Sequence, residues 1–413
     1  MRLFPYRVLD LTDGKGYLCG KILADLGADV IKVEPPGGDP DRRIGPFYHG
    51  IPDPERSLYW FAYNLNKKGI TLDIESADGK AIFKKLVSGA DIVIESFPVG
   101  YLNSLNLGYS ALKEIKPSII LTSITPFGQK GPRAGYEASD LTLLAMGGFL
   151  YITGYPDGPP VRVTIPQASL LAGSTAAAAT MIAHYHRQNT GTGQQVDVSI
   201  QASITWTITN VVSLWELNRM NLARKGSVLT GRYGTGANQR ILWPCKDGFA
   251  AYVVFGGALG VSMGNRRLTE WMQKEGLADE WIMQFEWEKH DLATATQETQ
   301  SRLEAYVEKL FVKYTKLELY QEGLKRDIKI FPAYSPKDVI KDPQLQSRGL
   351  WMNIEHPELN DGINYAGFFF KTTEHPPEIP IRAPLIGEHN QEIYRQLGMS
   401  SEDIVRLKQA NII

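Results

Sequence analysis

The sequence predicts an α/β fold whose large domain is built on a parallel, doubly wound (Rossmann-like) sheet. A short apolar run at Tyr6–Thr12 precedes a helical pattern over Gly14–Gly27, and a second apolar run follows at Asp29–Val33. Buried parallel strands read as short apolar runs, and strand–helix–strand units at this spacing pair in parallel. The same rhythm recurs along the chain at Ile70–Ile74 (strand), Ala77–Ser88 (helix), Ile92–Glu95 (strand), Tyr109–Ile115 (helix) and Ile119–Ile124 (strand).

A helix rich in small residues is expected to begin at Leu170. Gly173 and the run Ala176–Ala179 carry little side-chain bulk, so another backbone can approach this helix closely. The stretch Thr190–Gly193 ends the helix, because its two glycines tolerate positive φ. The alternating residues Gln194–Ser199 then predict another strand.

A change in local amino-acid composition near Arg224 predicts a domain boundary, because two glycine-rich turns follow one another up to Gly248. We expect a large domain at 1–224, a smaller α+β domain at 225–330, and a segment 331–413 that returns to the large domain. In the smaller domain Phe249–Phe255 reads as a strand and Arg267–Tyr320 as mostly helix. One final helix is expected to start near Gln391.

Charge and cysteine content argue against several classes of protein. The chain has 44 Lys and Arg against 45 Asp and Glu, so it has no global field that would attract nucleic acid or a membrane surface. The first residues meet charge and glycine too early for a signal peptide or a transmembrane helix. Two cysteines, Cys19 and Cys245, cannot form a metal site alone, and a reduced cytoplasmic setting is expected.

Ligands of doubly wound sheets bind beyond the carboxyl ends of the strands. This rule directs attention to the loops Glu34–Gly38, Ser96–Gly100 and Thr125–Gly131. No GxGxxG motif follows the first strand, so a dinucleotide site is not predicted. The sequence also lacks a recognisable Ser-His-Asp signature, HExxH or CxxC, and His184 and His186 lie on different sides of one helix.

The candidate ligand-binding residues are Glu34, Lys67, Phe97, Gly256 and Gly257. Lys67 could grip a phosphate together with Lys68, although a solvated lysine pair fits the same spacing. Phe97 could stack on a flat ring, or its proline–glycine corner could only shape a turn. The loop at Gly256 and Gly257 could be a lid or an ordinary turn.

Several segments resemble the family III CoA-transferases, the formyl-CoA and carnitine CoA-transferase type. The resemblance covers nearly the whole chain and rests on segments that follow one another in the family's order: Arg7–Leu11, Leu23–Glu34, Pro35–Pro40, Asn66–Asp73, Leu107–Tyr109, Gly128–Pro132, Thr190–Gln195 and Arg382–His389. Any one of these segments is a weak signal, but their number and order make the resemblance strong.

The resemblance implies two subunits threaded through each other like chain links, and the small-residue helix fits such an interface. It implies a CoA thioester as substrate, no covalently bound cofactor, and a reaction through mixed anhydrides and an enzyme-bound thioester. In this chemistry an aspartate attacks the acyl-CoA carbonyl and then carries CoA. Family members place that aspartate four residues before the glycine that opens the alanine helix. Here that glycine is Gly173, and four residues earlier stands Ser169.

Other positions also depart from the family pattern. The turn Asp13–Tyr17 replaces the family's alanine–glycine–proline turn near CoA, and Ser96 and Pro98 stand around the Phe97 corner in place of asparagine and arginine. A second acid near the reaction centre is retained as Asp140, preceded by Ser139 in place of an aromatic residue or histidine. Racemases of the same superfamily use a histidine in this region together with the missing aspartate, so racemase activity is disfavoured.

Three hypotheses follow from the resemblance. The first is a non-catalytic subunit of a heteromeric CoA-transferase, in which a paralogous chain supplies the aspartate and CoA moves between an acyl-CoA such as succinyl-CoA and a carboxylic acid. Such pairs occur in the family, and a succinyl-CoA:(R)-benzylsuccinate CoA-transferase of anaerobic aromatic degradation is the kind this chain most resembles. The second is a homomeric enzyme that uses another residue, for instance Asp140, and the third is a CoA-ester binding protein without catalysis.

Overall fold

The computed structural model describes the 413-residue chain apart from residues 1–2, 4, 231–235, 255, 257–260 and 375–379. It forms two compact units, which we describe separately: Met1–Tyr151, Arg162–Leu222 and Pro343–Ile413 make up the first, and Ile152–Val161 and Ala223–Asp342 the second. This division differs from the expected one, in which the smaller domain spans 225–330. The longer segment of the second unit begins at Ala223. The short segment Ile152–Val161 belongs to the second unit, and that unit continues to Asp342 beyond the expected end at 330.

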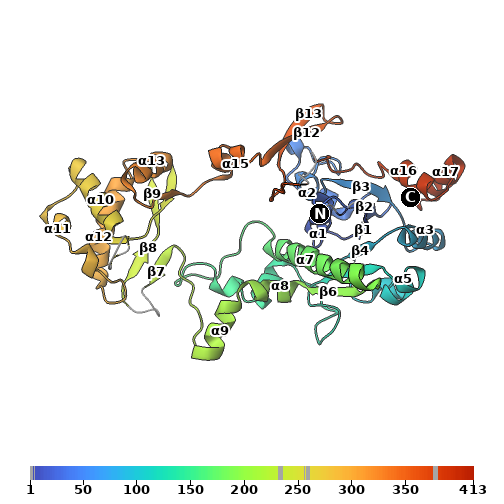
Figure 1. The fold of residues 1–413 in the computed structure, drawn as a ribbon, viewed down its shortest axis with the longest axis horizontal. Coiled ribbons are helices and arrows are strands. Elements are labelled where there is room, and N and C mark those ends of the chain that lie inside the picture. Colours follow the sequence, from blue (N-terminus) through green and yellow to red (C-terminus); the bar gives the residue numbers. More distant parts are fainter. Residues whose placement is uncertain (1–2, 4, 231–235, 255, 257–260, 375–379) are drawn as a thin grey trace. The chain divides into compact units, whose positions relative to one another are not determined.

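A six-stranded sheet, parallel throughout, forms the centre of the first unit (Figure 1). Its strands are β1 (Arg7–Leu11), β2 (Asp29–Glu34), β3 (Lys67–Thr71), β4 (Ile92–Glu95), β5 (Ile120–Thr125) and β6 (Gln195–Ser199). They lie in the order β3-β2-β1-β4-β5-β6, which is the order of a doubly wound sheet that reverses between β1 and β4. The predicted α/β fold with a parallel sheet is confirmed.

Helices cover both faces of this sheet because its strands bury side chains on both sides. Along β1, Leu9 belongs to one hydrophobic core and Val8 to the other, as the two-residue period of a strand requires. The Leu9 side is covered by α3 (Ala77–Ser88), α5 (Tyr109–Ile115), α16 (Asn390–Gln396) and α17 (Ser401–Gln409), and the Val8 side by α1 (Tyr17–Asp25), α6 (Asp140–Met146), α7 (Gln167–Thr190) and α8 (Ile200–Thr207). The other elements of this unit are α2 (Leu58–Tyr63), α4 (Tyr101–Ser104), α9 (Thr209–Asn218), α15 (Pro343–Ser347), β12 (Trp351–His356) and β13 (Asp361–Ala366).

The third strand and the C-terminal helix differ from their predictions. β3 begins at Lys67, three residues before the expected Ile70, because an ion pair with Asp10 allows the charged Lys67 to lie inside the fold. The prediction of one final helix is wrong, since α16 and α17 are separate. Gly398 follows Leu397, the C-cap of the first of them, with φ of 82°, a left-handed conformation that glycine adopts at helix ends.

The small-residue helix α7 begins at Gln167, so Ser169 lies inside its first turn and not before it. Its small face packs within this chain. A side chain at Gly173 would place its Cβ 2.9 Å from the Cβ of Leu18 on α1, and Ala172 and Ala176 are fully buried. One face of the small-residue helix thus makes a close helix–helix contact inside the first unit, while Ala178 on its other face is exposed, and a subunit interface there stays a prediction.

The second unit combines antiparallel strands with helices around an aromatic core. Its three-stranded sheet has the order β11-β10-β9, and β7 pairs with β8. The bounds are β7 (Val228–Thr230), β8 (Asn238–Arg240), β9 (Leu242–Cys245), β10 (Gly248–Ala251), β11 (Phe331–Pro332), α10 (Val261–Lys274), α11 (Glu280–Met283), α12 (Gln297–Phe311), α13 (Lys316–Arg326) and α14 (Pro336–Ile340). Trp243, Trp271 and Phe311 are buried in its core. β10 ends at Ala251, four residues before the expected end of this strand.

Two classes of feature can be checked over the part of the chain that the structure describes. No helix there is long and apolar enough to cross a membrane. Nor do three or more His, Cys, Asp and Glu side chains gather there into a group that could hold a metal ion.

Candidate functional site

The first turn of α7 lies against Asp140, the first residue of α6. Asp140 Oδ1 accepts a hydrogen bond of 2.8 Å from the backbone N–H of Ala168, the neighbour of Ser169. α6 is held in place by Ser139, whose side chain caps it by accepting from the N–H of Thr142. A carboxylate at a helix N-terminus satisfies an N–H without an intrahelical partner and suits the helix dipole. Two residues that the sequence singled out separately, Asp140 and Ser169, thus meet at one corner.

At this corner Ser169 supplies a hydroxyl, where the resemblance described above implies a nucleophilic carboxylate. The first turn of α7 contains no acidic residue, and its N-cap, Pro166, supplies no side-chain acceptor. Asp140 is the neighbouring acid, but its Oδ2 is buried without a hydrogen-bond partner and its Oδ1 is bonded to Ala168. A nucleophile must lie within contact distance of the acyl carbonyl with its attacking oxygen accessible. Asp140 therefore does not meet the requirement in this conformation.

A cavity of about 600 Å³ lies beyond the carboxyl ends of β1 to β4, where the strand order reverses. It is lined by Leu11, Thr12, Asp13, Lys15, Lys32, Val33, Glu34, Pro35, Asp39, Pro40, Leu72, Asp73, Ile74, Glu75, Ser96, Phe97, Pro98 and Tyr101. We call it the strand-end pocket. Ligands of doubly wound sheets bind at this edge, and two predicted residues, Glu34 and Phe97, lie in it.

An aromatic pair forms one wall of the strand-end pocket. The rings of Phe97 and Tyr101 are 4.7 Å apart between centroids and tilted by 36°. The Tyr101 hydroxyl donates a hydrogen bond of 2.6 Å to Glu75 Oε1, which fixes the ring. Such a wall suits contact with a flat ring.

Glu34 is buried, and its carboxylate is bound by other residues of the same chain. The guanidinium of Arg42 binds both of its carboxylate oxygens, with Nε 2.6 Å from Oε2 and Nη2 2.8 Å from Oε1. Glu34 Oε2 also accepts from the backbone N–H of Asp39. Arg42 in turn lies over the ring of Trp60, 3.7 Å from its centroid. These contacts give Glu34 a role in shaping the pocket wall.

Lys67 lies inside the fold and not in the strand-end pocket. Its side chain has no solvent exposure, and Nζ donates to Asp10 Oδ2 (2.8 Å), Tyr17 O (3.0 Å) and Asn64 Oδ1 (2.9 Å). An ammonium has three N–H groups, so none remains for a phosphate. Lys67 neither binds a phosphate nor belongs to a solvated lysine pair. The neighbouring Lys68 is partly exposed and forms an ion pair with Glu392. We therefore remove Lys67 from the candidate site.

Glu95, at the end of β4, was not singled out by the sequence and holds the corner that carries Phe97. Its Oε2 accepts a hydrogen bond of 2.7 Å from the Phe97 N–H. Burial raises the pKa of Glu95 from its usual 4.5 to about 7. Between these pH values the folded chain holds a proton that the unfolded chain has lost, so this group's contribution to stability falls as pH rises from 4.5 to about 7.

Glu95→Gln is therefore expected to raise the free energy of unfolding at pH 8 by about 1–3 kcal/mol and to change it little at pH 5. The neutral amide retains an oxygen for the Phe97 N–H and removes the cost of a buried charge. Chemical denaturation at the two pH values measures the effect. Glu114→Gln, at an exposed position of α5, is the matched control and should show no such pH dependence. An equal effect of Glu95→Gln at pH 5 and pH 8 would contradict the assignment.

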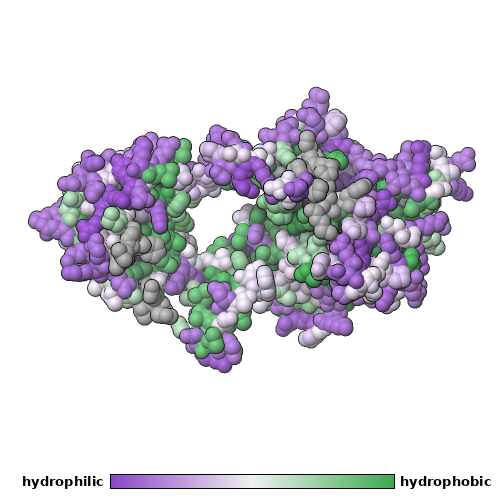
Figure 2. Space-filling view, viewed as in Figure 1, coloured by the Kyte–Doolittle hydropathy of each residue, from purple (hydrophilic) through white to green (hydrophobic). Residues whose placement is uncertain are grey.

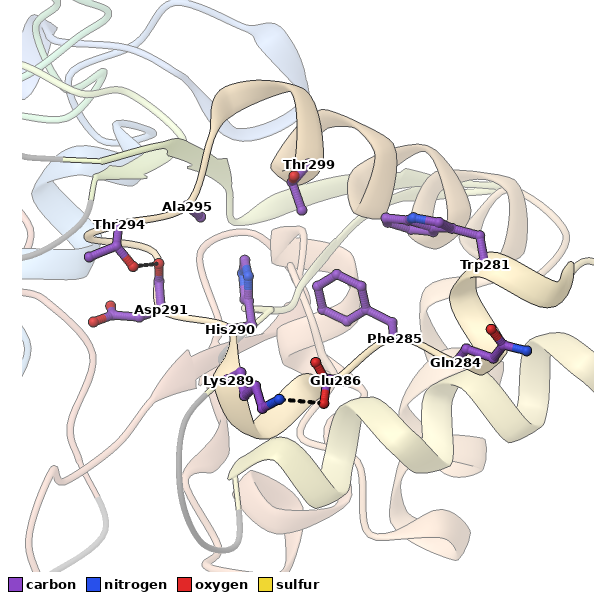
Figure 3. Close-up of a pocket in the computed structure, with 10 residues that line it drawn as sticks. All are labelled: Trp281, Gln284, Phe285, Glu286, Lys289, His290, Asp291, Thr294, Ala295 and Thr299. Carbon is purple, nitrogen blue, oxygen red and sulfur yellow. Dashed lines mark hydrogen bonds and ion pairs between the residues drawn. The ribbon is translucent and has the colours of Figure 1, made fainter.

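The second unit contains a separate cavity of about 450 Å³ (Figure 3). The charged side chains at its rim are engaged, since Lys289 pairs with Glu286 at 2.6 Å. His290 lies between Phe285 and the 291–295 loop, and burial lowers the pKa of its imidazole. A Cβ at Gly256 would lie 1.9 Å from the carbonyl oxygen of His290, so only glycine fits there. This close contact assigns Gly256 a packing role, while Gly257 lies outside the described residues.

Two features were missed in the sequence, one in the turn next to the strand-end pocket and one in its wall. Asp41 accepts a hydrogen bond of 2.7 Å from the Gly14 N–H, across 27 residues of sequence. Tyr101 completes the aromatic wall with Phe97. No local pattern signals the first contact, because a carboxylate that caps a distant turn has no fixed spacing. The second had a signal, since Tyr101 follows directly after the Phe97–Gly100 corner.

Comparisons with known proteins agree with this architecture. The family model "CoA-transferase family III" matches residues 4–390. The succinyl-CoA:(R)-benzylsuccinate CoA-transferase subunit BbsE of Thauera aromatica is 35% identical, with 97% of this chain and 96% of that protein covered. The succinyl-CoA–D-citramalate CoA-transferase of Chloroflexus aurantiacus is 30% identical over 96% of this chain and 94% of that one. The crystal structure of a CaiB/BaiF family protein from Brucella suis matches with a TM-score of 0.81 and 27% identity, covering 95% of this chain and 98% of that one.

The match spans both units, and relatives at 30% identity or more align along almost the whole chain. The parallel sheet, the small-residue helix and the strand-end pocket therefore belong to a protein of CoA-transferase family III.

Proposed function

We propose that this chain is the non-catalytic subunit of a heteromeric CoA-transferase, and that a paralogous chain supplies the nucleophilic aspartate. The observation that carries the proposal is Ser169 in the first turn of α7, a turn that contains no acid. A relative over nearly the whole chain is itself named as a subunit, which supports a partnered role. The substrates in that relative's name make succinyl-CoA the proposed CoA donor and benzylsuccinate the proposed acceptor.

The chemistry explains why serine cannot replace aspartate. A carboxylate that attacks an acyl-CoA forms a mixed anhydride and releases the CoA thiolate, which then attacks the aspartyl carbonyl and expels the carboxylic acid. The enzyme is left as an aspartyl thioester, and the acceptor carboxylate repeats the sequence in reverse. A serine hydroxyl that attacks the same carbonyl forms an ester, which contains no enzyme carbonyl that CoA could attack. Ser169 therefore stops the sequence at its first step.

Exposed apolar side chains on the first unit support assembly with a second chain, and interlocked subunits are the form we propose. Figure 2 shows apolar residues gathered over α9. Leu217 of α9 is 82% exposed, Trp206 of α8 77%, and Ile182 and Tyr185 of α7 70% and 69%. Large exposed apolar side chains that gather into a contiguous patch mark interaction surfaces. Gly173, Ala172 and Ala176 lie on the buried face of α7, whereas Ala178 is exposed on the same side of the helix as Ile182 and Tyr185.

The homomeric alternative depends on Asp140 as nucleophile. Its two oxygens are respectively bonded to the Ala168 N–H and enclosed without solvent contact, so the geometry favours a capping role. The binding-protein alternative requires the chain to bind a CoA ester, for which the strand-end pocket is the candidate site.

Expression of this chain alone and together with the paralogue tests the proposal. We expect the lone chain to be inactive or insoluble, and the co-expressed pair to transfer CoA from succinyl-CoA to a carboxylic acid. A well-folded lone chain that turns over succinyl-CoA would refute the proposed function.

The variant Ser169→Asp is expected not to restore transferase activity to the lone chain. The change returns a carboxylate to the first turn of α7 but alters nothing else around the site. The turn Asp13–Tyr17 and the Phe97 corner would still differ from the family pattern. A succinyl-CoA-dependent transferase assay of the lone variant measures this, with Ser174→Asp, at an exposed position of the same helix, as the matched control. Turnover by Ser169→Asp but not by the control would show that only the nucleophile has been lost.

A further inference from the structure

The turn between β1 and α1 is the place where a doubly wound fold offers backbone N–H groups to a phosphate. In this chain every N–H of that turn is already bound by an acceptor of the chain itself. The contacts are Thr12 N to Asp10 Oδ1 (3.0 Å), Asp13 N to Ser96 Oγ (2.8 Å), Gly14 N to Asp41 Oδ2 (2.7 Å), Lys15 N to Asp13 Oδ1 (3.0 Å), Gly16 N to Asp13 O (2.8 Å) and Tyr17 N to Asp13 O (3.2 Å). Asp13, Asp41 and Ser96 thus accept N–H groups that a phosphate would otherwise bind, and the buried Asp10 accepts the Thr12 N–H from inside the fold.

Glycine at position 14 makes the contact with Asp41 possible. A Cβ there would lie 2.8 Å from Asp41 Oδ2 and 2.7 Å from the hydroxyl of Tyr59, so a larger residue would force this carboxylate away. Burial, together with the neighbouring charges of Asp39 and Asp13, raises the pKa of Asp41. The turn is thus closed by close packing, and the carboxylates of Asp13, Asp39 and Asp41 lie near one another beside it.

The cations of the strand-end pocket are also engaged. Among the described residues that line it, the cationic ones are Lys15 and Lys32 and the acidic ones are Asp13, Glu34, Asp39, Asp73 and Glu75. Lys15 pairs with Asp13, and Lys32 pairs with Asp39 at 3.2 Å and also donates to the carbonyl of Thr12. Asp73 and Glu75 carry no ion pair with either lysine and add unbalanced negative charge to the wall. A ligand with several phosphate charges would lose its hydration here and gain few charge-assisted hydrogen bonds in return.

We infer that the strand-end pocket of this chain excludes CoA and other phosphate-bearing ligands, with Asp13 and Asp41 as the residues that determine this specificity. This step rests on the proposed function, in which only the paralogue carries out the transfer, and it predicts the number of CoA sites in the complex. An assembled pair of chains binds one CoA, in the catalytic paralogue. The aromatic wall of Phe97 and Tyr101 persists, but the phosphate positions beside it are filled.

Equilibrium binding of CoA to the native complex tests the inference. We expect one CoA bound per pair of chains at saturation, and two per pair would overturn the inference while leaving the proposed function intact. If the chain instead assembles only with itself and binds no CoA, the proposed function fails and the closed pocket stands. These outcomes separate the two claims.

Hydrogen exchange of the same complex provides a readout at the turn itself. CoA should leave the exchange of the peptide containing Thr12–Tyr17 unchanged in this chain, because its N–H groups are already bonded. In the paralogue, the equivalent peptide is expected to exchange more slowly when CoA is added, and this serves as the internal positive control. Slower exchange of the Thr12–Tyr17 peptide of this chain at saturating CoA would show phosphate binding at the turn and overturn the inference.

Discussion

Ser169→Ala is expected to leave kcat/KM of the assembled transferase within about two-fold of the unchanged enzyme, because a hydroxyl that cannot form an anhydride contributes no nucleophile. The matched substitution in the paralogous chain, aspartate to alanine at the equivalent position, should lower kcat/KM at least about 1,000-fold, since it removes the group that carries CoA.

Steady-state transfer from succinyl-CoA measures both variants of this pair in the same complex. Co-purification of the two chains serves as the control that assembly is intact. A loss of 100-fold or more with Ser169→Ala would mean that Ser169 takes part in the reaction, and the non-catalytic assignment would fail.

Lys67→Met is expected to lower the free energy of unfolding by about 3–5 kcal/mol, because it leaves the carboxylate of Asp10 buried without its cation. Both side chains are fully buried, and Lys67 also donates to Tyr17 O and Asn64 Oδ1. Lys68→Met, the neighbouring change on the same strand, should cost about 1 kcal/mol or less, since the Lys68 ion pair with Glu392 is solvent-exposed.

Chemical denaturation of the two variants measures this difference. The double variant Asp10→Asn/Lys67→Met should recover part of the stability lost in Lys67→Met, because no unpaired buried charge remains. Equal losses for Lys67→Met and Lys68→Met would contradict the buried ion pair and would reopen a ligand-binding role for Lys67.

The sheet could be predicted from the sequence because its strands are buried on both faces. Such strands read as apolar runs between helical patterns, as in Asp29–Val33 and Ile92–Glu95. The start of β3 could not, because Lys67 looks like the end of a loop until its partner Asp10 is known. The small residues of α7 indicated a close approach by another backbone, but only the structure identifies that backbone as α1 of the same chain.

The candidate site, like the fold, could be predicted from the sequence only in part. Ser169 and Asp140 could be singled out from motif spacing, and their common corner depends on one hydrogen bond to Ala168 that spacing does not reveal. The turn Asp13–Tyr17 stood out as a departure from the family pattern. Only the structure shows that Asp41 and Ser96, from other loops, accept hydrogen bonds from the N–H groups of this turn. Local pattern locates such a turn, and tertiary contacts decide whether it can still bind a phosphate.

Chemical trapping of the enzyme-bound intermediate tests the central claim most directly. The native complex is incubated with succinyl-CoA and then with hydroxylamine, which attacks the carbonyl of an aspartyl thioester or anhydride, releases CoA or succinate, and leaves a hydroxamate on the aspartate. Intact-mass measurement of the separated chains then shows which chain carried the intermediate. We predict a hydroxamate on the paralogous chain and an unmodified mass for this one, whereas a hydroxamate on this chain, at Asp140 or elsewhere, would contradict its assignment as the non-catalytic subunit.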